Sequence, residues 1–177
     1  MRSFILVFIT IGTLLMIVVM QKTGASLKTM QTPKGIIDLE FAYNAEKTEY
    51  VINAWQKNEA VDNIGTAKLN TELDFIFILF YSIFLYKVCC SIAVLHNGWI
   101  KNAGLILGNG AIAAGLLDVV ENTGMLFSLH GYIHNIISLI TFSSSVTKWL
   151  LVLLALLYFI LAGAVYFFSN NLLIHKK

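Results

Sequence analysis

The chain has 177 residues, of which 58% are hydrophobic and only 12% are charged, and its formal net charge is +2. A soluble domain is about 45–50% apolar and about 25% charged, so a chain of this composition has too few polar groups to cover its apolar surface in water. Composition therefore excludes an ordinary soluble domain and indicates a single polytopic membrane domain over residues 1–177. The basic residues form no stripe with interleaved aromatic residues, so a nucleic-acid partner is not expected.

Four apolar stretches are long enough to cross a hydrocarbon core of roughly 30 Å. They cover approximately residues 4–20, 75–95, 103–126 and 149–168. Because backbone amides in lipid must be satisfied within the protein, each stretch is predicted to be a helix. The sequence thus predicts an all-α fold, an integral membrane four-helix bundle.

The first loop, residues 21–74, is too long to be a simple connector between two spans. Thr32 followed by Pro33 is typical of a helix start, with Thr32 as the N-cap. Apolar residues then recur at loosely helical spacing as far as Trp55, and a second helical stretch is expected to continue into the second span. We therefore predict that helices over about residues 33–72 form a cap on the outer face of the bundle.

The second outer loop precedes the fourth span. Residues of about 130–141 are apolar but too few to cross a membrane, which predicts a short interfacial segment. The run Ser143-Ser144-Ser145 is typical of a loop that ends in the N-cap of the last helix.

Four spans place both termini on one side of the membrane. The short flanks on that side contain several basic residues, namely Arg2, Lys87, Lys101, Lys176 and Lys177. Short cytoplasmic flanks carry an excess of Lys and Arg, so a multi-pass protein with both termini in the cytoplasm is predicted.

Ionisable side chains occur inside the third span, where they are costly and usually face a bundle interior, a cavity or a partner. Small residues recur at steps of three or four along this span and lead to Asp118 and Asn122, so these two side chains share the packed face. Asp118 lies about 22 Å along a helix that starts at Ala103, close to the outer interface. Glu121 follows one turn higher, and Asp74 begins the antiparallel second span at the same level.

The carboxylates of Asp74, Asp118 and Glu121 cannot all be ionised together in a low dielectric without a cation or a hydrogen-bond donor. Together with Asn122 they are the candidate ligand-binding residues of an acidic pocket near the outer leaflet. The first hypothesis is therefore a binding or accessory membrane protein. Besides contacting membrane lipids, it would hold a lipid-like or amphiphilic ligand, a cation, or a helix of a partner membrane subunit.

A second hypothesis is a membrane-embedded lipid hydrolase or isomerase, in which Asp118 or Glu121 is the catalytic general acid and base. If their segment is helical, His130 and His134 share one face, and with Asp74 they could hold a divalent metal that activates water. The sequence leaves open whether the protein is an enzyme, and this metal is the one cofactor for which it offers candidate ligands.

Overall fold

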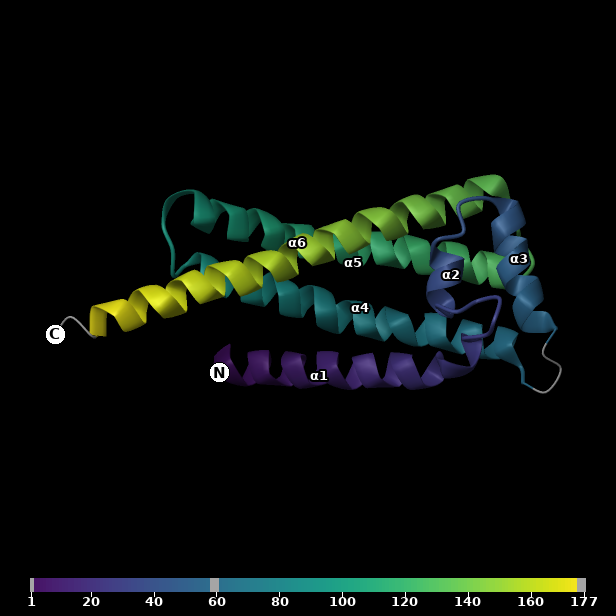
Figure 1. Cartoon of the computed structure of the whole chain (residues 1–177), viewed down its shortest axis with the longest axis horizontal. Coiled ribbons are helices and arrows are strands. Elements are labelled where there is room, and N and C mark those ends of the chain that lie inside the picture. Colours follow the sequence, from purple (N-terminus) through teal and green to yellow (C-terminus); the bar gives the residue numbers. More distant parts are fainter. Residues whose placement is uncertain (1, 58–60, 175–177) are drawn as a thin grey trace.

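The computed structural model describes residues 2–57 and 61–174, and in this part of the chain all regular structure is helical. Four long helices run in alternating directions along the long axis of the molecule (Figure 1). They are α1 (Arg2–Thr23), α4 (Asn63–Ala93), α5 (Gly98–Leu129) and α6 (Asn135–Ile174). Each of them is long and apolar enough to cross a membrane, so the predicted all-α membrane bundle is confirmed.

Helix α5 is the centre of the bundle, since it packs along α4 on one side and along α6 on the other. Its small residues make this close packing possible. A Cβ atom on Gly104 would clash with the Tyr158 hydroxyl, and a Cβ atom on Gly115 would lie 3.0 Å from the Cβ of Ser82. Helix α1 packs mainly against α4, and most of its large apolar side chains point outward, as expected of a helix that faces lipid.

The first loop folds into a helical cap at one end of the bundle, as predicted. It contains the short helices η1 (Ala25–Leu27), α2 (Ile36–Glu40) and α3 (Ala45–Gln56), which lie at the right of Figure 1. Trp55 is buried at its centre and donates through Nε1 to the Leu27 carbonyl oxygen at 2.9 Å and to Thr32 Oγ1 at 3.1 Å. The cap is thereby an ordered part of the core.

Thr32 is not the N-cap of a helix, contrary to the prediction. Its buried hydroxyl donates to the Leu27 carbonyl oxygen at 2.8 Å, inside the core of the cap. Helix α2 begins only at Ile36, after Gly35 with a φ of 67°. Glycine adopts positive φ readily, so the chain turns at Gly35 and the helix starts beyond that turn.

The last helix also begins earlier than predicted. The expected interfacial segment and the serine run were placed before a span at 149–168, but Asn135 starts a single helix that includes Ser143, Ser144 and Ser145. Serine favours loops because its hydroxyl competes for backbone groups. Here Ser144 and Ser145 are buried, with Ser145 within hydrogen-bonding distance of the cap, so packing outweighs that local preference.

Both termini lie at the end of the bundle opposite the cap, in agreement with an even number of spans (Figure 1). Which side of the membrane this end occupies remains a prediction. Lys176 and Lys177, part of the basic flank behind that prediction, are outside the described residues.

Candidate functional site

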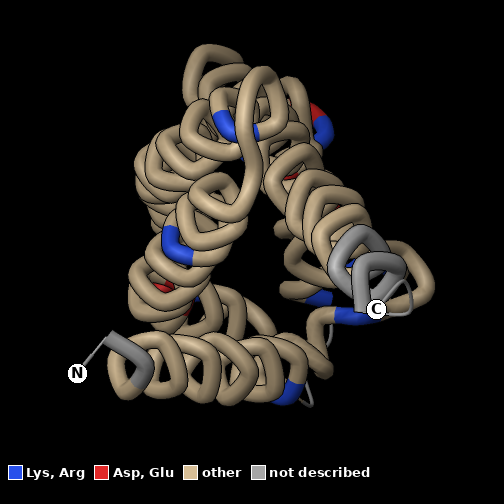
Figure 2. Tube along the Cα trace, turned by 90° about the vertical axis from the view of Figure 1, so that its left-hand side faces the viewer, with Lys and Arg blue, Asp and Glu red and all other residues tan. Residues whose placement is uncertain are grey.

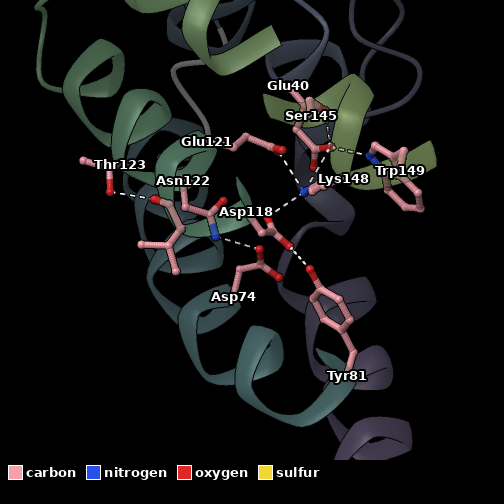
Figure 3. Close-up of polar contacts among 11 residues, drawn as sticks. Glu40, Asp74, Tyr81, Asp118, Glu121, Asn122, Thr123, Ser145, Lys148 and Trp149 are labelled. Carbon is pink, nitrogen blue, oxygen red and sulfur yellow. Dashed lines mark hydrogen bonds and ion pairs between the residues drawn. The ribbon is translucent and has the colours of Figure 1, made fainter. Parts of the chain in front are cut away.

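Lys148 of α6 lies at the centre of a buried polar cluster. The residue is 6% exposed, and its ammonium donates to Asp118 Oδ1 at 2.6 Å and to Glu121 Oε1 at 2.9 Å. Glu40 of α2 places its Oε2 atom 3.8 Å from the same nitrogen. Figure 3 shows these carboxylates converging on Lys148 from two different helices.

The spacing of residues along α5 directs two of these carboxylates toward α6. Asp118 and Glu121 are three residues apart, so they occupy neighbouring positions on one side of the helix. Asp118 is 3% exposed and Glu121 is fully buried. The face of α5 that the small residues define therefore presents its acids to the interior of the bundle, as the sequence indicated.

Helix α4 adds a second set of contacts behind the first. The Tyr81 hydroxyl donates to Asp118 Oδ2 at 2.8 Å, and Asn122 Nδ2 donates to Asp74 Oδ2 at 2.7 Å (Figure 3). The structure thus brings together all four predicted ligand-binding residues and adds further members. We refer to the whole set as the Lys148 network; it comprises Glu40, Asp74, Tyr81, Asp118, Glu121, Asn122 and Lys148.

Glu40 connects the network to the cap. Its Oε2 atom accepts a hydrogen bond from Trp149 Nε1 at 3.1 Å and lies 3.4 Å from the donating hydroxyl of Ser145. Both partners belong to α6, so these contacts join the short helix α2 to the bundle. Glu40 is one acid among several in a polar loop, and no local pattern in the sequence distinguishes it.

Lys148 was also missed by the sequence reasoning, because it was placed in the outer loop before the fourth span. One signal was available. Lys148 is the only lysine or arginine between residues 102 and 175, and it directly precedes an apolar stretch. Buried carboxylates require a buried cation or donor, so the acids of the third span could have been paired with it.

The network is not balanced in charge or in hydrogen bonds. Three carboxylates, those of Glu40, Asp118 and Glu121, lie within 4 Å of a single ammonium, and a fourth, that of Asp74, is bound by Asn122, which leaves three negative charges if all four are ionised. Moreover, Glu121 Oε2 and Asn122 Oδ1 are buried and have no hydrogen-bond partner among the described residues. A buried acceptor without a partner costs about 1–3 kcal/mol, and more when it is charged.

The predicted metal ligands are not brought together. Residues 131–134 are not helical, so His130 and His134 do not share a helical face, and both side chains are exposed. Asp74 is instead engaged by Asn122. Within residues 2–57 and 61–174, no group of three or more His, Cys, Asp or Glu side chains is arranged to hold a metal ion.

Comparisons with protein family models, with curated proteins and with solved structures give no match to this chain. Fold and site together define its class: a four-span helical membrane protein with a capped, buried carboxylate–lysine network. A fold does not determine a function, so the function has to be argued from the network itself.

Proposed function

We propose that this protein binds the cationic head of an amphiphilic ligand at the Lys148 network. The observation that supports the proposal is the surplus of negative charge, three carboxylates within 4 Å of one ammonium and a fourth bound by Asn122. In addition, the Oε2 atom of Glu121 has no hydrogen-bond partner among the described residues. An uncompensated buried anion costs several kcal/mol, so a further positive group would stabilise this region. Carboxylate oxygens and an amide oxygen are suitable partners for such a group.

The position of the network favours a ligand with both polar and apolar parts. The network lies at the capped end of the bundle, and the helices below it are apolar over most of their length. A few convergent polar groups beside an apolar region are typical of small-molecule sites. A basic side chain on a helix of a partner membrane subunit would offer the same ammonium or guanidinium chemistry.

The cap is the side on which the network can open. The contacts of Glu40 with α6 and Lys148 are long, between 3.1 and 3.8 Å, whereas those between α5 and Lys148 are 2.6 and 2.9 Å. Helix α2 has five residues and is flanked by non-helical residues. A ligand would therefore enter by displacing α2 rather than by separating α5 from α6.

Thermal unfolding of the purified full-length chain tests the proposal. The probes are a long-chain alkylammonium and a long-chain alkyltrimethylammonium, one at a time, in phosphatidylcholine nanodiscs, with the matching alcohol as neutral control. A cation at 100 times its Kd would raise the free energy of unfolding by about 2.7 kcal/mol. We expect at least one probe to stabilise the parent chain, and Glu121→Gln to abolish that stabilisation because the carboxylate charge is removed.

The matched control is Glu72→Gln, which removes an exposed acid from α4 close to Asp74 in sequence. This variant should respond to the probe as the parent does. If no probe stabilises the parent, or if Glu121→Gln is stabilised as strongly as Glu72→Gln, the proposal is wrong and the network serves only to hold the helices together.

A further inference from the structure

The two ends of the molecule differ sharply in charge. All ten acidic residues lie between positions 38 and 121, and residues 75–117 among them contain no acid. The acids among the described residues therefore belong to the cap and to the capped ends of α4 and α5. Figure 2 shows the opposite end from outside. The residues of α4 and α5 at that end include Lys87 and Lys101, and residues 75–117 contain no acid.

At this basic end, α1 and α4 separate. They approach closely at Gly12, where a Cβ atom would clash with the Phe80 ring, and the rings of Phe8 and Phe80 are 6.0 Å apart. Toward the start of the chain the two helices diverge (Figure 1). A groove of about 440 Å³ opens between them there, within the range of about 300–1,000 Å³ that ligand sites occupy.

The groove is apolar on most of its surface and polar at a few points. Ile5 of α1 and Val94, the residue directly after α4, are among the side chains that form its apolar walls. Lys87 and Ser91 of α4, one helical turn apart, contribute an ammonium and a hydroxyl on one side. This arrangement matches a ligand that has a hydrocarbon part and an anionic head.

The ammonium of Lys87 forms no ion pair with any acid in residues 2–57 and 61–174. Every ion pair in the described part of the chain involves Lys148, and the aromatic ring of Tyr86, 5.9 Å away, is the contact found for Lys87 Nζ. Lys87 lies six residues before the end of α4, so about 9 Å below that end along the helix axis. A lysine at this depth extends its charged group toward the headgroups of the membrane.

We infer that this groove binds an anionic phospholipid. Its phosphate would accept hydrogen bonds from the Lys87 ammonium and the Ser91 hydroxyl, while an acyl chain would lie along Ile5 between α1 and α4. Because the sequence places no acid at this end of the bundle, no carboxylate there would repel an anionic headgroup. The site is separate from the Lys148 network and does not depend on the function proposed for it.

Native mass spectrometry of the delipidated full chain tests the inference, with phosphatidylglycerol and phosphatidylcholine of the same acyl chains as probes. The parent should bind phosphatidylglycerol more tightly. Lys87→Gln should weaken that binding about fivefold, the effect of one basic charge near an anionic headgroup. Lys101→Gln removes an exposed lysine from the same end on α5 and should leave the affinity unchanged.

A steric variant gives an independent measurement. Val94→Trp introduces a large ring at an exposed position of the groove while keeping Lys87, and it should reduce binding of both lipids. Equal binding of the two lipids by the parent, an unchanged affinity in Lys87→Gln or Val94→Trp, or complete competition by inorganic phosphate alone would each overturn the inference. The last outcome would point to a site for the free anion.

Discussion

Lys148 is the residue on which the polar cluster depends, because its ammonium contacts acids from both α2 and α5. Buried ion pairs contribute little net stability compared with apolar residues of the same shape, yet breaking one by removing a partner is costly. Asp118 keeps a second donor, Tyr81, whereas Glu121 has Lys148 as its hydrogen-bond donor among the described residues. Removing the lysine should therefore leave Glu121 as the buried carboxylate with the fewest hydrogen-bond donors.

We expect Lys148→Met to lower the free energy of unfolding by about 3–5 kcal/mol, because two buried carboxylates lose their counter-ion. Chemical unfolding in detergent measures this. Lys101→Met, at an exposed position of α5, should change the free energy by no more than about 0.5 kcal/mol. Adding Asp118→Asn and Glu121→Gln to Lys148→Met should restore part of the loss. A single Lys148→Met variant as stable as the parent would mean that the carboxylates do not need its charge.

Among the helices, α2 occupies a special position, since its last residue, Glu40, contacts the bundle through α6. The cap has its own apolar core around Trp55, which also includes Met125 and Leu129 from α5. The cap is thus held by apolar packing on α5 and by polar contacts on α6, which are those of Glu40 and the hydrogen bonds Thr48–Ser138 at 2.8 Å and Ala45–Asn135 at 2.9 Å. Short helices with few contacts open locally at lower free energy than core helices do.

We expect Glu40→Ala to increase the rate of amide hydrogen exchange in α2 and α3, because the side-chain contacts with Trp149 and Ser145 are lost. Exchange in the middle of α5 and α6 should stay at the parent rate. Glu46→Ala, an exposed position on α3, is the control and should leave the cap protected. Equal protection of the cap in the Glu40→Ala variant and the parent would show that the Glu40 contacts do not hold it, and that apolar packing and the hydrogen bonds from α3 to α6 are sufficient.

For the whole molecule, the arrangement of charge follows the bundle axis. Every acid among the described residues belongs to the cap end, and the opposite end holds Lys87 and Lys101 without any acid. The positive-inside rule counts lysine and arginine in short flanks, and the location of this end in the cytoplasm remains a prediction from that rule. The apolar outer faces of the four long helices would then contact lipid, with the cap outside the cytoplasm.

We expect epitope tags at the N-terminus and the C-terminus to be protected from protease in intact cells, because both ends of the chain lie opposite the cap. Cleavage within the cap should instead occur from outside. A control in permeabilised cells should expose both tags. Protection of one tag and digestion of the other would contradict the four-span topology. Digestion of both tags would show that the protein has the opposite orientation in the membrane.

The sequence by itself determined the four helices, because a lipid environment leaves the backbone no other way to satisfy its hydrogen bonds. It also determined that Asp118 and Asn122 face inward, because helical periodicity places them on the stripe of small residues. Both conclusions rest on local spacing. The boundaries at Thr32 and Ser143–Ser145 were wrong because tertiary contacts outweigh the local preferences of short polar runs.

Only the tertiary structure decided which groups meet the buried acids. Lys148 lies 27 residues from Glu121 along the chain, and Trp149 lies 109 residues from Glu40. Pairings of this kind depend on how α6 and the cap pack against α5, and no local periodicity encodes them. The predicted metal site failed for the same reason. His130 and His134 are exposed, and their candidate partner Asp74 accepts a hydrogen bond from Asn122 instead.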